Sequence, residues 1–231
     1  MSKVCVVTGG GSGIGKAVAM NLPKEYTVVI TGRSLEKLQK TADQLNEDGR
    51  HIVATTCDVS KREEVKKLAE YAASLGEVVK VFHCAGVSGS MASKDTIVRI
   101  NALGTVYVNQ EFYKVMNGGV ICDTSSNSSF ILPSFLMPSK KLYALAVSDE
   151  EKFVTKMVKK ASMTKDEYMC SQMAYFMSKG FVRWYAKQCG YKYLANKGIR
   201  VFSISPGFVK TPMTELEQGE ATDTLLSYTA L

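Results

Sequence analysis

Five glycines lie within seven residues directly after a short β-branched run near the start of the chain. The run covers residues 4–8, and the glycines stand at positions 9, 10, 11, 13 and 15. Helix-forming residues follow from Lys16, so the pattern predicts a buried strand, a tight turn and the first turn of a helix. Glycine permits close approach of the backbone, and a helix N-terminus offers N–H groups and a positive dipole end. The turn therefore suits a phosphate or pyrophosphate.

The spacing of this turn is Gly9-x-x-x-Gly13-x-Gly15. It differs from the GxGxxG dinucleotide fingerprint, and it is not a P-loop, because no Lys-Ser or Lys-Thr pair follows the last glycine. A flexible turn between strand and helix is the simpler alternative. Motifs elsewhere in the chain are needed to distinguish a phosphate-binding turn from a flexible one.

The length of 231 residues suits one domain, or two small ones, with a substantial core. The N-terminal apolar run is too short for a signal peptide, and no stretch approaches the roughly 18 apolar residues of a spanning helix. Six cysteines without CxxC or paired spacing indicate buried thiols in a reducing compartment. We expect a cytoplasmic protein with no metal site and no membrane partner.

The net charge of +7 raises the possibility of nucleic-acid binding. The lysines are, however, mixed with acidic residues along predicted helices, as in residues 61–67. A solvated helix face is the better interpretation, and a basic surface also suits an anionic cofactor. We expect no nucleic-acid partner; salt-sensitive binding to DNA or RNA without nucleotide affinity would reverse this view.

Strand and helix signals alternate along the whole chain. The predicted strands cover residues 4–8, 26–31, 51–57, 78–84, 119–124 and 199–205. Helices are predicted from Ser34, from a capping box at Ser60, and over about 96–116. This order predicts an α/β fold: a single doubly wound parallel sheet of the Rossmann type over residues 1–231, with helices on both faces and ligands at the carboxyl ends of the strands.

Tyr175 and Lys179 lie one helical turn apart, roughly 5–6 Å between Cβ atoms. A neighbouring ammonium favours the phenolate and lowers the pKa of a tyrosine. Tyr175 could therefore act as a general acid toward a carbonyl oxygen or as a base toward an alcohol. Tyr193 and Lys197 have the same spacing, but they lie just before the last predicted strand, at a helix end remote from the strand tips, so we favour Tyr175.

Taken together, these motifs resemble the short-chain dehydrogenase/reductase family over most of the chain. The resembling segments are the Thr8–Gly15 turn, Asp58-Val59, His83-Cys-Ala-Gly86, Tyr175-x-x-x-Lys179 and Ser205-Pro-Gly-Phe-Val-Lys-Thr211. The resemblance implies the catalytic residues Asn101, Ser126, Tyr175 and Lys179. It implies cofactor contacts from Gly9, Ser12, Gly13, Ile14, Gly15, Arg33, Ser34, Asp58, Val59, Cys84, Ala85, Gly86, Asn101, Tyr175, Lys179, Pro206, Gly207, Val209 and Thr211.

The family mechanism implies a role for each catalytic residue. Hydride passes between the nicotinamide and a substrate carbon while Tyr175 gives or takes the proton on oxygen. Ser126 would hydrogen-bond the substrate oxygen, and Lys179 would tune Tyr175 and hold the nicotinamide ribose. Asn101 would fix a water that links Lys179 to solvent. The implied function is an NAD(P)-dependent oxidoreductase acting on CH-OH groups.

Three features depart from the family pattern. Cys84 replaces the usual asparagine of the Asn-Ala-Gly motif, and Phe202 stands where asparagine is common. The chain stops at Leu231, where family members usually continue through another helix and a seventh strand. The resemblance also implies a homo-oligomer, a dimer or tetramer.

The residues after the second predicted strand bear on the choice of cofactor. An acidic residue there would bind the ribose hydroxyls and repel a 2′-phosphate, but the chain has Arg33-Ser34. A guanidinium and a hydroxyl suit a phosphate, so NADP(H) is favoured over NAD(H). Ser12, where a basic residue would strengthen this choice, leaves NAD(H) open.

Tyr175 follows Ser126 by 49 positions, a longer interval than is usual in the family, so about 127–167 is an insertion. Capping boxes at Ser148 and Thr164 predict a short amphipathic helix within it and the start of the Tyr175 helix. We expect an element that covers the substrate; a surface decoration or a dimer contact is the alternative. Methionines at 169, 173 and 177 are interpreted as core beneath the insertion, or else as an adaptable pocket wall.

Similar insertions occur in 3α-hydroxysteroid dehydrogenase/carbonyl reductases and in monomeric carbonyl reductases. The first-ranked substrate is therefore a bulky apolar ketone or a hydroxysteroid, and the second is a 3-oxoacyl thioester or a sugar-like carbonyl. A catalytically weak nucleotide-binding regulatory protein of the same fold is the alternative from a different class.

Overall fold

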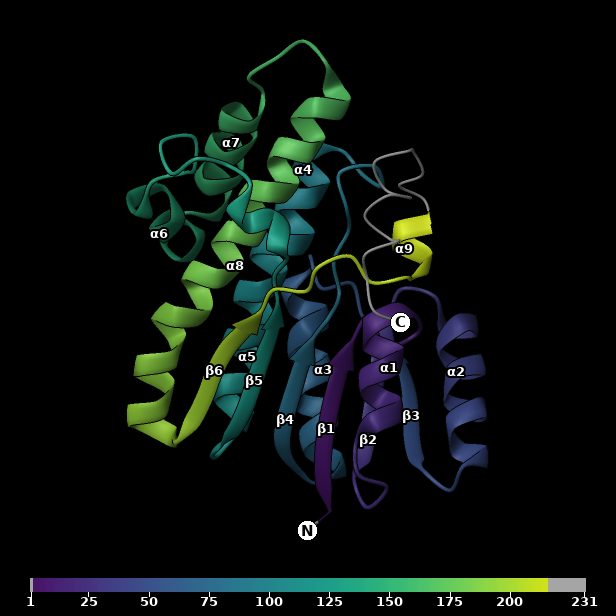
Figure 1. Cartoon of the computed structure of the whole chain (residues 1–231). Coiled ribbons are helices and arrows are strands. Elements are labelled where there is room, and N and C mark those ends of the chain that lie inside the picture. Colours follow the sequence, from purple (N-terminus) through teal and green to yellow (C-terminus); the bar gives the residue numbers. More distant parts are fainter. Residues whose placement is uncertain (1, 216–231) are drawn as a thin grey trace.

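The computed structural model describes residues 2–215, with strands side by side and helices packed against them (Figure 1). The strands are β1 (Lys3–Thr8), β2 (Thr27–Gly32), β3 (His51–Thr56), β4 (Glu77–His83), β5 (Gly119–Thr124) and β6 (Ile199–Ile204). The α-helices are α1 (Gly13–Asn21), α2 (Leu35–Glu47), α3 (Arg62–Leu75), α4 (Lys94–Ile97), α5 (Gly104–Val115), α6 (Lys140–Ser148), α7 (Glu150–Ala161), α8 (Glu167–Lys197) and α9 (Pro212–Glu215). A π-helix, η1 (Val98–Leu103), and a 3-10 helix, η2 (Asn127–Phe130), complete the described elements.

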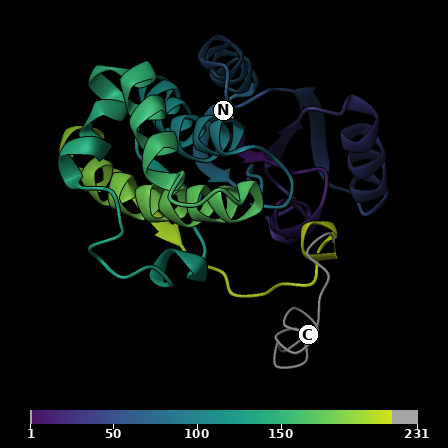
Figure 2. The ribbon, with the colours of Figure 1, turned by 90° about the horizontal axis from the view of Figure 1, so that it is seen from above.

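The strands form one parallel sheet in the order β3-β2-β1-β4-β5-β6. Helices α1 and α2 lie on one face, while α3, α5 and α8 lie on the other (Figure 2). Side chains of β1 alternate between two buried clusters, with Val4 and Val6 in one and Cys5 and Val7 in the other. Both faces of the strand are therefore buried, which is why it reads as a continuous apolar run. The predicted doubly wound α/β fold is confirmed.

The chain runs outward from β1 to β3 and then returns to β4 beside β1. Loops that leave β1 and β4 consequently diverge, and this topological switch point is where open α/β sheets bind ligands. Because all strands are parallel, the loops after β1, β4, β5 and β6 meet at the same edge. The predicted site residues at strand ends are thereby brought to one side of the molecule.

The helix predicted over 96–116 is present but irregular. Helix α4 runs directly into the π-helix η1 and then into α5. A π turn is wider than an α turn and is frequent at functional sites. Asn101 lies within it and is buried.

The predicted capping boxes are wrong by one or two residues. The observed N-caps are Lys61, Asp149 and Asp166, where the boxes begin at Ser60, Ser148 and Thr164. At α7 and α8 an aspartate carboxylate accepts first-turn amides, from Lys152 N at 3.1 Å and from Tyr168 N at 2.9 Å. A charged acceptor at the positive end of a helix outcompetes the nearby hydroxyl.

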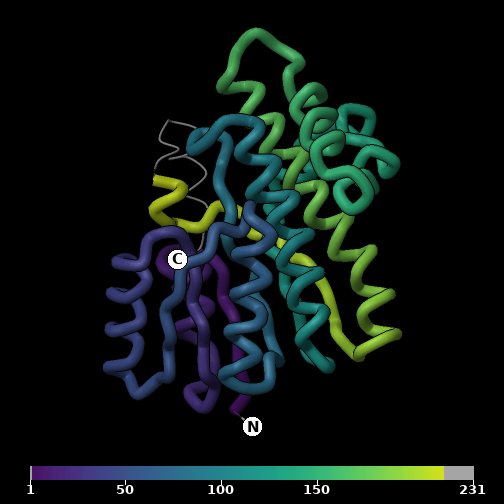
Figure 3. The backbone as a smooth tube through the Cα atoms, turned by 180° about the vertical axis from the view of Figure 1, so that it is seen from behind, coloured from purple at the N-terminus to yellow at the C-terminus, as the bar shows by residue number. Residues whose placement is uncertain are grey.

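The segment between Ser126 and α8 contains two α-helices after η2, where one helix is predicted from the sequence. Helix α7 buries the predicted apolar face, and α6 was missed. Both lie beside α8 near the top of the molecule, and α7 also packs against α4 and η1 (Figure 3). Arg99 holds α7 through two 2.8 Å bonds to the Glu151 carboxylate. Of the methionine stripe, Met177 is fully buried but Met169 is 46% exposed, so the core interpretation is wrong for the first turn of α8.

All six cysteines are unpaired thiols, and five of them are buried, as predicted. Across residues 2–215, none of the helices is long and apolar enough to cross a membrane. The same part of the chain contains no cluster of three or more His, Cys, Asp or Glu side chains suited to a metal ion.

Candidate active site

The glycine turn after β1 is packed too closely at Gly9 and Gly15 to hold side chains there. A Cβ on Gly15 would lie 2.3 Å from the Gly9 carbonyl oxygen, and a Cβ on Gly9 would lie 2.9 Å from the nitrogen of Ala85. Gly9 and Gly13 also have positive φ angles, +68° and +50°. The N-cap Ser12 makes no side-chain capping bond, so the first-turn N–H groups of α1 remain for a ligand. The turn fits a phosphate group.

Thr8 connects the end of β1 to the end of β4. Its Oγ1 lies 2.8 Å from His83 Nδ1 and accepts a hydrogen bond from Ala85 N at 3.1 Å. Burial, and to a smaller extent the charge of Lys179, lowers the pKa of His83 to about 3. The imidazole is therefore neutral at ordinary pH, and its unprotonated nitrogen can accept from the Thr8 hydroxyl. These hydrogen bonds of Thr8 position the loop that carries Ala85 and Gly86.

Gly86 brings the loop after β4 against two predicted catalytic residues. A Cβ at this position would lie 3.1 Å from Asn101 Oδ1 and 3.3 Å from Lys179 Nζ. Asn101 Oδ1 accepts from Val87 N at 2.9 Å, and Asn101 Nδ2 donates to Val87 O at 2.9 Å and to Ser178 Oγ at 3.2 Å. The side-chain amide of Asn101 thus ties the β4 loop to α8.

Tyr175 and Lys179 lie on successive turns of α8, with Lys179 Nζ 5.8 Å from the centre of the Tyr175 ring. Nζ donates to the Thr124 carbonyl at the end of β5 at 2.9 Å. Burial lowers the pKa of Lys179 to about 8, while Cys84 and Asp123 act in the opposite direction. An ammonium with a pKa this close to neutrality is typical of functional sites.

The loop that carries Ser126 is attached to the end of β6. Ser125 N donates to Ile204 O at 2.8 Å, and Asn127 N donates to Pro206 O at 2.9 Å. Ser126 is half-buried, and its hydroxyl accepts from the first-turn amide of η2 at 3.2 Å. The structure therefore brings Ser126 beside the Pro206-Gly207 segment.

The segment after β6 crosses to the glycine turn. The nearest atom to a Cβ on Gly13 would be Thr211 Cγ2, at 3.3 Å. Gly207 lies near Asn127, whose Nδ2 would be 3.6 Å from a Cβ on that glycine. Val209, between them, is 41% exposed. The strand ends of β1, β5 and β6 are consequently joined around one site.

The predicted adenosine-side residues lie on the opposite flank, after β2 and β3. Asp58 Oδ1 accepts from the nitrogen and the hydroxyl of Ser60 at 3.0 and 2.7 Å, and Val59 is buried against Gly104. Ser34 caps α2 by accepting from Lys37 N, so its hydroxyl is already engaged. Arg33 is exposed and takes no part in the ion pairs of residues 2–215.

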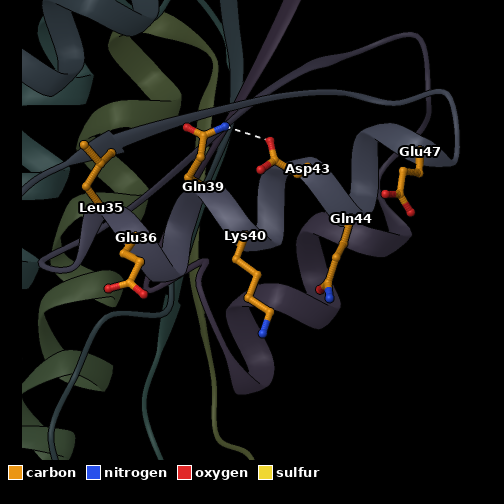
Figure 4. A pocket seen from close by; sticks show the side chains of 7 residues that line it. All are labelled: Leu35, Glu36, Gln39, Lys40, Asp43, Gln44 and Glu47. Atoms are coloured by element: carbon orange, nitrogen blue, oxygen red, sulfur yellow. Dashed lines mark hydrogen bonds between the residues drawn. The ribbon is translucent and has the colours of Figure 1, made fainter.

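A hollow lies on the face of α2, close to Arg33 in sequence (Figure 4). It is lined by Leu35, Glu36, Gln39, Lys40, Asp43, Gln44 and Glu47. All of these come from one helix, and Gln39 Nε2 donates to Asp43 Oδ1 at 2.8 Å. The hollow lies between solvated side chains of a single helix and contains none of the predicted catalytic residues.

A buried acid that was not predicted from the sequence lies beneath the site. Asp123 is fully buried in β5, and Asn109 Nδ2 on α5 lies 3.0 Å from each of its carboxylate oxygens. Burial raises the pKa of Asp123 to about 7, with Asn109 and Lys179 acting oppositely. A lone carboxylate directly after the apolar run of residues 119–122 and directly before Thr-Ser-Ser is the signal that could have revealed it.

The buried imidazole predicts a specific pH dependence of stability. Because the pKa of His83 is lower in the folded chain, protonation favours the unfolded chain, and stability is lost as the pH falls below about 6.5. The wild type masks this loss in part, since the raised pKa of Asp123 stabilises the fold on acidification. The stability deficit of His83→Asn relative to wild type should therefore shrink by about 2 kcal/mol between pH 7.5 and pH 5.

Urea unfolding at both pH values measures this difference. His51→Asn, which changes the exposed histidine at the start of β3, is the matched control for loss of an imidazole. A deficit of His83→Asn that is equal at the two pH values would contradict the prediction.

The chain is similar in sequence to known oxidoreductases. A sequence profile described as short chain dehydrogenase matches residues 3–140, from β1 to the first residue of α6. An uncharacterized oxidoreductase of Staphylococcus aureus (strain USA300) is 32% identical over 223 residues, which is 92% of this chain and 80% of that protein.

Solved structures share the fold. A short chain dehydrogenase from Burkholderia cenocepacia J2315 in complex with NADP has a TM-score of 0.73 and 22% identity, covering 99% of this chain and 83% of that one. A short chain dehydrogenase/reductase from Burkholderia phymatum in complex with NAD has a TM-score of 0.70 and 22% identity, covering 96% of this chain and 72% of that one.

Proposed function

The chain belongs to the short-chain dehydrogenase/reductase family, and from this premise we propose that it transfers a hydride between a nicotinamide cofactor and a carbonyl or secondary alcohol. It is an NAD(P)-dependent oxidoreductase; the finer assignment is a ketone reductase or hydroxysteroid dehydrogenase acting on CH-OH groups. The observation that carries this assignment is the buried Lys179 ammonium, held one helical turn from Tyr175 and bonded to the end of β5.

Each proposed catalytic residue has a role that follows from its position. The nicotinamide supplies or accepts the hydride when it is bound. Tyr175 donates a proton to the carbonyl oxygen in reduction, since the charge of Lys179 stabilises the phenolate that remains. Ser126, at the end of β5, donates a hydrogen bond to the same oxygen. Asn101 connects the β4 loop to α8 through hydrogen bonds of its side-chain amide. We also propose that it holds a water.

The phosphates of the cofactor fit the glycine turn. Gly9 and Gly15 have no room for a Cβ, and α1 begins without a side-chain cap, so backbone N–H groups are available to anionic oxygens. Ser12, Gly13 and Ile14 would contribute these groups. The remaining proposed contacts are Asp58 and Val59 for the adenine, Arg33 and Ser34 for the ribose side, Cys84, Ala85 and Gly86 after β4, and Pro206, Gly207, Val209 and Thr211 after β6.

The preference for NADP(H) rests on Arg33. The guanidinium of Arg33 takes part in none of the ion pairs of residues 2–215. It can therefore pair with a 2′-phosphate. Arg33→Asp should raise the Kd of NADPH about 10–100-fold, because a charge-assisted contact is lost and the new carboxylate repels the 2′-phosphate. The Kd of NADH should stay within about threefold or fall, since a carboxylate there can bind the ribose hydroxyls. Fluorescence titration with both nucleotides measures this, and Arg200→Asp, the same charge change on β6, is the control. Equal losses for both nucleotides would contradict the preference.

A bulky apolar ketone or hydroxysteroid is the proposed substrate class. Large apolar side chains in the segment after Ser126 are exposed to solvent. The exposed fraction is 62% for Phe130, 63% for Ile131 and 78% for Phe135. Burying such surface against an apolar substrate would be favourable. The insertion that carries them is proposed to cover the substrate. A 3-oxoacyl thioester or a sugar-like carbonyl is the second choice.

The decisive experiment is titration of the purified chain with NADPH and NADH, followed by NADPH oxidation over a panel of ketones. Binding with turnover supports a reductase. Binding without turnover favours the catalytically weak regulatory protein, and no binding of either nucleotide overturns the proposal. Size-exclusion chromatography of the same sample tests the proposed dimer or tetramer, and cell fractionation tests the proposed cytoplasmic location.

A further inference from the structure

A row of polar side chains crosses the sheet beneath the candidate site. Thr8, His83 and Asp123 are register partners on β1, β4 and β5, and all three are buried. Thr8 and His83 bond to each other, whereas Asp123 turns to Asn109 on α5, whose Nδ2 lies 3.0 Å from each carboxylate oxygen. A buried carboxylate is retained only where it has such partners or a nearby positive charge.

The nearby positive charge is Lys179. Its side chain is buried, and Nζ donates to the carbonyl of Thr124, the residue directly after Asp123. The ion pairs of residues 2–215 do not include Lys179, so its desolvated charge has no direct carboxylate contact. An isolated buried ammonium is costly and tends to lose its proton.

Apart from Tyr175 on α8, which lies beside Lys179, the other ionisable groups around the pair do not supply a negative charge at neutral pH. They are His83 and Cys84 from the β4 side, Cys122 on β5, and Cys189 and Tyr193 on α8. Burial raises the pKa of Cys122 to about 12 and that of Cys189 to about 11, and it also raises the pKa values of Cys84 and Tyr193. His83 is neutral.

We propose that Asp123 is a positioning residue that supplies the counter-charge for Lys179 across the end of β5, while Asn109 orients its carboxylate. This inference rests on the proposed function, in which the charge of Lys179 tunes Tyr175. It is consistent with a pKa of about 7 for Asp123, raised by burial and opposed by Asn109 and Lys179, and with a pKa of about 8 for Lys179, lowered by burial and opposed by Cys84 and Asp123. Near pH 7.5 most of the carboxylate is therefore ionised and most of the lysine keeps its proton.

Removing the carboxylate of Asp123 should therefore favour the neutral, deprotonated form of Lys179. Asp123→Asn, which keeps the shape of the side chain, should lower the pKa of Lys179 by about one unit and reduce its charged fraction at pH 7.5 about threefold. Chemical-shift titration of 13C-labelled lysine Cε measures this directly, with Lys179 identified by its absence in Lys179→Met. The alkaline limb of the kcat profile for ketone reduction should move to lower pH by the same amount, with KM within about twofold.

Two further variants keep the test independent of folding. Asn109→Leu removes the amide from the carboxylate, favours its protonated form and should lower the pKa of Lys179 in the same direction. Asp95→Asn removes an exposed carboxylate on α4 that pairs with Arg99 on η1, and it should leave the pKa of Lys179 unchanged. A Lys179 titration that Asp123→Asn does not move overturns the inference even where turnover persists. A moved titration without any turnover retains the inference and rejects the proposed function.

Discussion

Tyr175→Phe should lower kcat for NADPH-dependent ketone reduction by about 10²–10⁴-fold, because it removes the proton donor from the reacting oxygen. The ring of Tyr175 stays in place beside Lys179 Nζ, 5.8 Å away, so the cofactor should bind as before. We expect a Kd for NADPH within about threefold of wild type. Steady-state kinetics together with nucleotide titration separate the two effects.

The chain contains its own control for this substitution. Tyr193 and Lys197 repeat the Tyr-x-x-x-Lys spacing on the same helix, but Tyr193 is buried and stacked on Tyr113, with ring centres 4.2 Å apart. Tyr193→Phe removes the same hydroxyl and should leave kcat within about twofold. Comparable losses of kcat in the two variants would show that Tyr175 is not the proton donor.

Gly15→Ala should damage both the fold and cofactor binding. Its Cβ would lie 2.3 Å from the carbonyl oxygen of Gly9, and backbone atoms cannot rotate away as a side chain can. We expect a loss of about 1–3 kcal/mol in the free energy of unfolding. The displaced turn should also misalign the N–H groups of α1 and raise the Kd of NADPH at least about a hundredfold.

Gly11→Ala is the matched control in the same turn. A Cβ there would lie 3.4 Å from Leu38 Cδ2, an ordinary contact with a flexible side chain, and Gly11 has no positive φ. Its stability in urea should stay close to that of wild type. If Gly15→Ala were as stable as Gly11→Ala and bound NADPH normally, the close packing of this turn would not be needed for binding.

Much of the fold was predictable because its signals are local. The predicted strand over 119–124 coincides with β5, and the other five predicted strands differ from the observed ones by one residue at one or both ends. A strand buried on both faces must be apolar throughout, and the break at its end must contain turn residues. These requirements act over fewer than about ten residues, so they are visible in the sequence.

Several details of the site were not predictable in this way. The π turn that holds Asn101 arises inside a helical pattern that looks continuous in the sequence. Helix α6 was missed, because its burial of Tyr143 and Ala146 depends on the neighbouring α7 and α8.

The sequence by itself determined the order of strands and helices, the glycine turn, and the spacing of Tyr175 and Lys179, since each depends on residues close together in the chain. Only the tertiary structure decided what surrounds them. The environment of Asp123 on β5 is formed by Asn109 on α5 and Lys179 on α8. Burial and electrostatic interaction depend on distances in space, and those distances are set by how the sheet brings separate strand ends together.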